Sequence, residues 1–177
     1  LMHEALRTIL GDHVAQRGSL NDLNRMRFDF SHSKPLNNEE LELVEAHVNY
    51  YVRQNTEVIT RLMSPKEATK LGARALFGEK YGEEVRVVSM GLRANASFDA
   101  SGSNAYSVEL CGGTHVKRTG DIGCFKIISE TASASGIRRI ECYTGEEVIK
   151  YQAKQEKILK EVGTLLKTTG SDIVPRL

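Results

Sequence analysis

Apolar residues recur at helical spacing in several segments of the chain and alternate with polar residues in the segments between them. Residues 1–10 carry apolar side chains three or four positions apart, which predicts the end of an amphipathic helix that Gly11 closes. A second helix is expected after Asn37 and Asn38, with glutamates in its first turn. Its buried stripe is expected to contain Leu41, Val44, Val48, Tyr51 and Val52.

Two patterns of Ser or Thr followed three positions later by Glu predict helix starts. Residues 64–67 form such a capping box with proline at the first helical position, and the short helix behind it should end near Gly72 or Gly78. Residues 144–147 predict a second capping box and a helix that runs to about Lys167. The long helix carries a heptad seam, interrupted by Gln155, of Val148, Tyr151, Ile158, Val162 and Leu165. This seam suits pairing with one other helix but is too short to establish a coiled coil.

Short runs with strand-like alternation predict strands at 25–30, 57–63, 85–90, 106–110, 124–129 and 137–142. Residues 13–20 read as a loop or a strand edge, and the polar residues 91–104 as a mobile loop. The small residues 131–136 predict a hairpin connection. We therefore expect an α+β fold, with a mainly antiparallel sheet packed against helices in a domain of residues 1–143. Residues 144–177 should begin a separate helical region.

Composition narrows the class of protein. The 177 residues carry a formal net charge of +1, so any RNA contact must come from local basic clusters. Neither a long apolar run nor a secretory signal is visible. The three cysteines are widely spaced and odd in number, which favours reduced thiols. These features together predict a cytoplasmic protein without a membrane partner. Leu1 begins within a helical pattern and lacks a cap, so we expect the chain to be a piece of a longer protein.

The most informative motif is Cys111-Gly112-Gly113-Thr114-His115, which follows a predicted strand. A thiolate and an imidazole four positions apart can face one metal ion, and glycines allow the backbone to bend and to approach a ligand. Two ligands do not make a zinc site, however. A Gly-Gly turn flanked by Cys and His is the alternative interpretation.

Six segments together resemble the editing region of alanyl-tRNA synthetase, and the resemblance spans nearly the whole chain. The six segments are residues 13–19 (HVAQRGS), 27–32 (RFDFSH), 75–81 (ALFGEKY), 111–115 (CGGTH), 119–123 (TGDIG) and 136–141 (GIRRIE). Editing domains of threonyl-tRNA synthetase and freestanding editing proteins share the Cys/His scheme. The predicted long helix from 145 onward favours the full alanine enzyme.

The resemblance implies hydrolysis of the ester in mischarged Ser-tRNA(Ala) and Gly-tRNA(Ala). An alanine pocket cannot exclude glycine strongly, because one methyl group contributes only about 1–3 kcal/mol, and it cannot strongly reject the added hydroxyl of serine. The partners implied are the acceptor end of tRNA(Ala) and the rest of the synthetase. ATP would bind only in a part of that enzyme outside this chain, since no Walker-type loop is present here.

The family also implies a zinc site, with Cys111 and His115 as two of its four ligands. A His-x-x-x-His pair supplies the other two in this family and would lie just before Leu1, so His3 is not one of that pair. The chain as printed is therefore expected to bind zinc weakly or not at all. This leaves two alternatives to an active editing domain, namely a catalytically silent module that holds the tRNA end and a freestanding editing protein. A small structural zinc protein would need four ligands.

Further site residues follow from the resemblance. Gln16 lies near the amino-acid pocket, where its amide could bond a serine hydroxyl; a solvated loop amide is the alternative. The backbone of Gly112, Gly113 and Thr114 could donate N–H groups to the scissile carbonyl, or form only a turn. Four basic residues are candidates for phosphate contacts or for a solvated face: Lys117, Arg118, Arg138 and Arg139.

The remaining polar residues of interest have simpler interpretations. Asp121 is expected to cap a loop rather than to accept a proton. The histidines at 13, 32 and 47 are expected to pack or lie on the surface. Cys124 and Cys142 fall in strand patterns and should be buried thiols.

Overall fold

The computed structural model of the protein describes residues 1–74 and 82–176, and their strands form two antiparallel sheets. One sheet has the order β1-β2-β7-β6 and the other β3-β4-β5. The strands of the first sheet are β1 Gln16–Asn21, β2 Met26–Ser31, β6 Phe125–Ala134 and β7 Ile137–Thr144. Those of the second are β3 Ile59–Met63, β4 Val85–Leu92 and β5 Ala105–Leu110.

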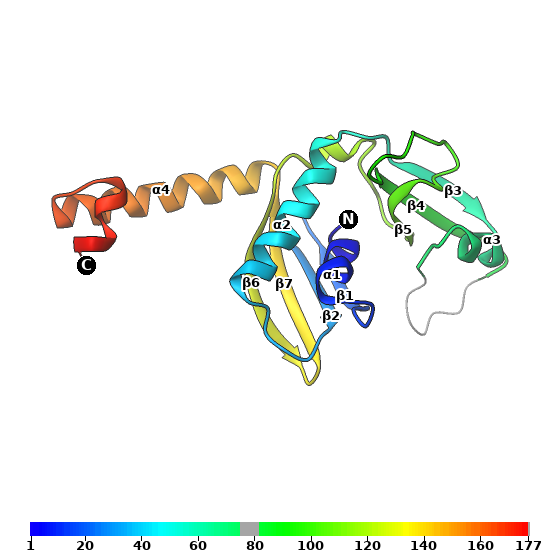
Figure 1. Cartoon of the computed structure of the whole chain (residues 1–177), viewed down its shortest axis with the longest axis horizontal. Helices are drawn as coiled ribbons and strands as arrows, with labels where there is room; N and C mark the ends of the chain where they lie inside the picture. Colours follow the sequence, from blue (N-terminus) through cyan, green and yellow to red (C-terminus); the bar gives the residue numbers. More distant parts are fainter. Residues whose placement is uncertain (75–81, 177) are drawn as a thin grey trace.

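Helices accompany both sheets. They are α1 Met2–Leu10, α2 Asn38–Arg53, α3 Pro65–Lys70 and α4 Glu146–Leu166, with short 3-10 turns η1 Thr119–Ile122, η2 Gly170–Asp172 and η3 Val174–Arg176. Helices α1 and α2 lie against the four-stranded sheet, and α4 extends away from it (Figure 1). The predicted α+β class is confirmed. The motif at 75–81 lies outside the described residues, and so does Gly78, one of the two suggested ends of α3.

The main core fills the space between α1, α2 and one face of the four-stranded sheet. Because side chains alternate along a strand, β2 and β7 direct every second residue toward the helices. The buried residues of this core include Phe28, Phe30, Val44, Val48, Val52, Ile140 and Cys142. A smaller core packs α3 against the second sheet through Met63, Ala68, Val87 and Val108.

Two of the three predicted helix starts have side-chain caps. Asn37 and Ser64 each accept a hydrogen bond from the backbone three residues on, and the glutamate there bonds back. The capping box expected at 144–147 is wrong. Thr144 is still paired with Phe125 in the sheet, so Gly145 occupies the cap position, with φ +53°, and makes no side-chain cap bond.

The last hairpin is longer than its sequence indicates. Strand β6 continues to Ala134, so the small residues from 131 belong to the sheet and only residues 135–136 form the turn, with Gly136 at φ +68°. The sequence allowed either a loop or a strand edge at residues 13–20, and in the structure residues 16–21 form an edge strand. Residues 93–104 contain no helix or strand, and the hydroxyls of Ser101 and Ser103 bond the carboxylate of Asp99.

A junction between α2 and the second sheet sets the two sheets relative to each other. Tyr51 stacks on Tyr106 with ring centroids 3.6 Å apart. The side-chain amide of Gln54 exchanges two hydrogen bonds with the backbone of Leu92, at 2.9 and 2.8 Å. Gly91, at φ +72°, lies directly beneath the Tyr51 ring. This junction joins α2, which packs on the four-stranded sheet, to the three-stranded sheet.

Helix α4 leaves the sheet after one buried turn. Val148 is fully buried, whereas Ile158 is 44% exposed and Leu165 is 83% exposed. The predicted seam is thus covered at its start and again near Val162, where the chain folds back, and is exposed between them. None of the helices in the described residues is long and apolar enough to cross a membrane.

Candidate functional site

A cavity of about 230 Å³ lies between the two sheets and brings together three residues predicted from sequence. Gln16 reaches it from β1, while Cys111 and His115 reach it from the turn after β5. The walls are completed by apolar side chains of both sheets, including Phe28 and Val88. Residues about 100 positions apart in the chain therefore face one space.

The turn at 111–115 is held by an arginine from the neighbouring strand β4. Arg86 Nη1 donates to the carbonyl oxygens of Cys111 and Gly113, both at 2.7 Å, and lies 3.4 Å from His115 Nδ1. The N–H of Cys111 donates in return to the Arg86 carbonyl at 3.1 Å. Burial, and then the charge of Arg86, lower the pKa of His115 below its ordinary value. A neutral imidazole in this position can act as a ligand or hydrogen-bond partner.

The two glycines of this turn do not bend the chain in the manner expected. Neither Gly112 nor Gly113 has a positive φ. A Cβ at Gly112 would meet nothing within 4 Å, and one at Gly113 would meet only the Cys111 sulfur at 3.7 Å. Turn geometry therefore does not require either glycine, and the open backbone leaves room for a ligand to approach.

Three polar residues of the cavity were not singled out by the sequence. His3 Nδ1 lies 3.3 Å from the carboxylate of Glu109, and Ser107 Oγ lies 3.4 Å from it. Burial alone would raise the pKa of Glu109, but its hydrogen bond with His3 opposes this effect and helps to hold that pKa low. The sequence did contain a signal for Ser107 and Glu109. They lie four and two positions before Cys111, so along a strand all three side chains point to the same face.

Gln16 has a local partner inside this cavity. Its Nε2 donates to Ser19 Oγ at 3.1 Å, and both residues line the space. The amide is therefore oriented rather than freely solvated. Its predicted contact with a substrate hydroxyl stays a prediction.

The described donor set fits zinc chemistry in type but not in number. Thiolate and imidazole are usual zinc ligands, and Cys111 and His115 share one cavity wall. Across residues 1–74 and 82–176, no group of three or more His, Cys, Asp or Glu side chains is arranged to hold a metal. A four-coordinate site here requires donors beyond these two.

The four predicted basic residues do not form one patch. Arg138 and Arg139 are adjacent in β7 and therefore point to opposite faces of the sheet. Arg138 pairs with Glu130, its Nη2 lying 2.6 Å from the carboxylate. Arg139 makes two bonds of 2.7 Å to Asp29.

The other two basic residues lie near the turn. Lys117 is exposed, while the Arg118 guanidinium bonds the side chain of Asn55 at 3.1 Å and also its carbonyl. Asp121 accepts the Arg118 N–H at 2.9 Å, so its predicted role as a loop cap is confirmed. A phosphate contact stays a prediction for all four basic residues.

The histidines and cysteines outside the cavity have mostly structural surroundings. His13 and His32 share a hydrogen bond of 2.8 Å at the surface, and His47 is half-buried. Cys142 is buried, and burial raises the pKa of its thiol to about 12. The prediction for Cys124 is wrong, because it is exposed. Strand β6 starts at Phe125, which takes the buried position instead.

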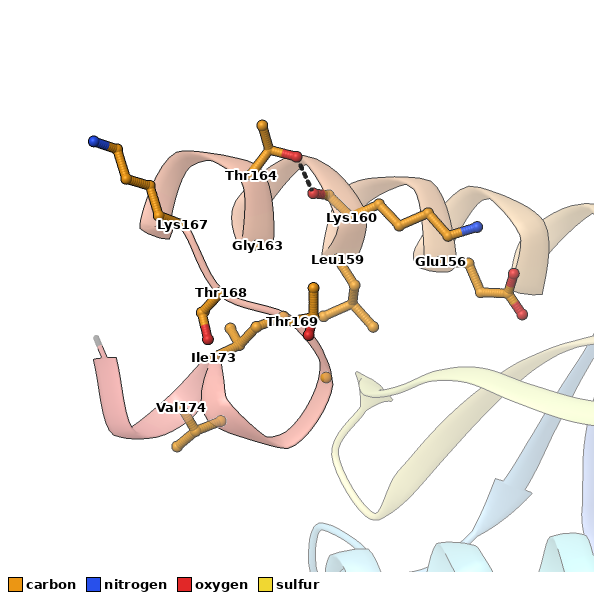
Figure 2. A pocket seen from close by; sticks show the side chains of 11 residues that line it. Glu156, Leu159, Lys160, Gly163, Thr164, Lys167, Thr168, Thr169, Ile173 and Val174 are labelled. Atoms are coloured by element: carbon orange, nitrogen blue, oxygen red, sulfur yellow. Dashed lines mark hydrogen bonds between the residues drawn. The ribbon is translucent and has the colours of Figure 1, made fainter.

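A second, larger hollow of about 900 Å³ lies at the far end of α4 (Figure 2). The segment after α4 folds back, so that Leu159 of the helix and Ile173 of the returning chain line the space between them. Glu156 is its single carboxylate, and its lining has no histidine or cysteine. The smaller cavity between the sheets is therefore the candidate site.

Comparison with known proteins shows what the segment that carries the turn is similar to. Residues 85–141, which supply Arg86 and the turn at 111–115, match the family model described as "Threonyl and Alanyl tRNA synthetase second additional domain". This segment is therefore similar to that domain family.

Similarity over the whole chain points to the alanine enzymes rather than to the threonine enzymes. All 177 residues align with alanine–tRNA ligase of Dinoroseobacter shibae at 59% identity, covering 20% of that protein. The alanine–tRNA ligases of Parvibaculum lavamentivorans and Paracoccus denitrificans are 56% and 55% identical over the same length. The chain thus spans about a fifth of the length of these relatives. Its resemblance to a stretch of alanyl-tRNA synthetase is confirmed.

Proposed function

We propose that the cavity between the sheets is an editing site that hydrolyses the ester of Ser-tRNA(Ala) and Gly-tRNA(Ala). The observation that carries this proposal is the convergence of Gln16, Cys111 and His115 on one cavity from opposite walls. Its volume of about 230 Å³ suits a small amino acid and part of a ribose rather than a whole nucleotide. The acceptor end of tRNA(Ala) would enter from outside, and the cytoplasm is the compartment in which we place the reaction.

Within this site the chain's own residues would have distinct tasks. The Gln16 amide, held by Ser19, would bond the serine hydroxyl. The carboxylate of Glu109, oriented by His3, is an acceptor for positively charged or N–H groups of the substrate. Backbone N–H groups in the turn at 111–115 would face the ester carbonyl.

Zinc is part of this proposal through Cys111 and His115, completed by donors outside the described residues. When bound, the metal would polarise the ester or a water molecule. A catalytically silent module that holds the tRNA end is the competing function. It is favoured by the incomplete donor set of the described residues.

Deacylation by a full-length alanine–tRNA ligase that contains this segment tests the proposal. We expect Cys111→Ala to abolish hydrolysis of Ser-tRNA(Ala) with aminoacylation nearly unchanged, and Gln16→His to impair it by replacing a flexible amide with a bulkier ring. Arg138→Ala serves as a contrast. If Arg138 contacts tRNA, its loss should weaken Ser- and Gly-tRNA(Ala) hydrolysis equally, because phosphate contacts carry no information about the amino acid.

The outcome separates the competing functions. Wild-type clearance of serine by Cys111→Ala would show that this cavity is not the editing site. Binding of the tRNA end without hydrolysis by the unmodified enzyme would favour the silent module.

A further inference from the structure

Arg86 holds the turn at 111–115 by two of its carbonyl groups. Both hydrogens of its Nη1 are directed to the oxygens of Cys111 and Gly113, at 2.7 Å each. The backbone of Arg86 also pairs with the N–H of Cys111. Two peptide groups, 111–112 and 113–114, are therefore fixed with their carbonyls facing the same guanidinium.

The opposite ends of these two peptide groups must point away from Arg86. A trans peptide is planar, and its N–H is antiparallel to its C=O. The described chain has no cis peptide bond. The N–H groups of Gly112 and Thr114 consequently project from the other side of the turn. Within residues 1–74 and 82–176, neither group donates a hydrogen bond to protein.

The space in front of Gly112 is open. A Cβ there would contact nothing within 4 Å, and the residue has no positive φ. The flanking residues Cys111 and His115 line the cavity of the proposed site. The N–H groups of Gly112 and Thr114, which have no protein acceptor among the described residues, lie on exposed backbone between two residues that line that cavity, and two such donors are what a developing oxyanion requires.

We propose that Arg86 is a positioning residue that aligns the N–H groups of Gly112 and Thr114 to stabilise the oxyanion of ester hydrolysis, an inference that rests on the proposed editing function. Attack of a water oxygen on the ester carbon moves the C=O π electrons onto the carbonyl oxygen, where the two N–H groups meet it. Collapse then breaks the bond to the ribose oxygen. That oxygen takes up the proton lost by the water, which gives free amino acid and tRNA.

The test compares Arg86 with a second arginine that also bonds two backbone carbonyls, Arg7, which in addition pairs with the carboxylate of Asp12, in a full-length alanine–tRNA ligase. Arg7 Nη1 also donates to two carbonyls, those of Asp12 and Val14, at 2.6 and 2.9 Å. Arg86→Met and Arg7→Met each remove such a clamp and keep the aliphatic stem. We expect Arg86→Met to lower kcat on Ser-tRNA(Ala) about 10²-fold with KM changed by less than about threefold. Arg7→Met should keep kcat, and both variants should show similar shifts in thermal midpoint.

The conservative variant Arg86→Lys distinguishes alignment from general stability. Its ammonium keeps the charge and can bond a carbonyl, so we expect it to restore part of the kcat that Arg86→Met loses. If Arg86→Met does not fold, Arg86→Lys carries the test with an expected loss of about tenfold in kcat.

Each remaining outcome has one meaning. The inference is overturned if Arg86→Met keeps the wild-type kcat, or if Arg86→Lys does so where Arg86→Met does not fold. An equal loss of kcat in Arg7→Met also overturns it. If the unmodified enzyme itself does not deacylate Ser-tRNA(Ala), the proposed function fails rather than the role of Arg86.

Discussion

Gly91→Ala should weaken the junction that holds the two sheets around the cavity. A Cβ at Gly91 would lie 2.8 Å from Cδ1 of Tyr51 and 3.3 Å from Cβ of Tyr106. Neither neighbour can retreat freely, because their rings are stacked 3.6 Å apart with an interplanar angle of 12°. The residue also has φ +72°, a conformation that alanine adopts with strain.

The two contributions to the free energy of unfolding can be separated with a matched glycine. Gly136 has φ +68° and nothing within 4 Å of an added Cβ. Alanine at such a φ costs about 1–2 kcal/mol, which a less flexible unfolded chain offsets by about 0.4–1 kcal/mol. Gly136→Ala should therefore destabilise by about 1 kcal/mol. Gly91→Ala adds an overpacking cost of about 1–3 kcal/mol.

Urea unfolding of the wild type and both variants measures the difference, provided that the slopes agree. A double-mutant cycle supplies the decisive comparison. In a Tyr51→Ala background the 2.8 Å contact with the Tyr51 ring is absent, so the cost of Gly91→Ala should fall toward that of Gly136→Ala, with only the 3.3 Å contact to Tyr106 Cβ remaining. Equal costs for the two glycine variants in the wild-type background would refute the steric argument.

Two further predictions concern titratable groups. An Ellman's-reagent assay at pH 8 should label exposed Cys124 quickly and Cys142 only after unfolding, because burial raises the Cys142 pKa to about 12; early labelling of Cys142 would contradict this. Burial, and then the neighbouring His13, lower the pKa of His32 in the folded chain below 6.5. Below about pH 6.5 the unfolded chain therefore binds more protons at this residue than the folded chain does, and the free energy of unfolding should fall as the pH drops. His32→Gln should reduce this loss between pH 7.5 and 5.5, measured by urea midpoints, and an unchanged loss would exclude His32 as its source.

Local signals were sufficient to predict most elements of the fold. The spacing of apolar residues predicted α1 and α2, and the capping box at Ser64 predicted the start of α3. Each of these signals acts within a few residues, so it survives without knowledge of the partner surface. The motif at 111–115 and Gln16 likewise pointed to the site from sequence and family resemblance.

The prediction failed where a distant segment competed for the same residues. Thr144 could not cap α4 because it is paired with Phe125 across the sheet. Cys124 lies outside the core because Phe125 begins the buried part of β6. In both cases strand pairing decided the outcome, and pairing depends on residues far away in the chain.

Sequence, together with the family resemblance, thus determined which local elements form and which short motif is the candidate for the chemistry. Only the tertiary structure decided which groups meet: Glu109 with His3, Arg86 with the carbonyls of the turn, and Arg139 with Asp29. The physical reason is that helix caps and periodicity are encoded between near neighbours, whereas contacts such as Arg139 with Asp29 form only after strands far apart in the sequence have paired, and His3 with Glu109 only after α1 has packed beside the three-stranded sheet. The cavity itself is a product of that packing.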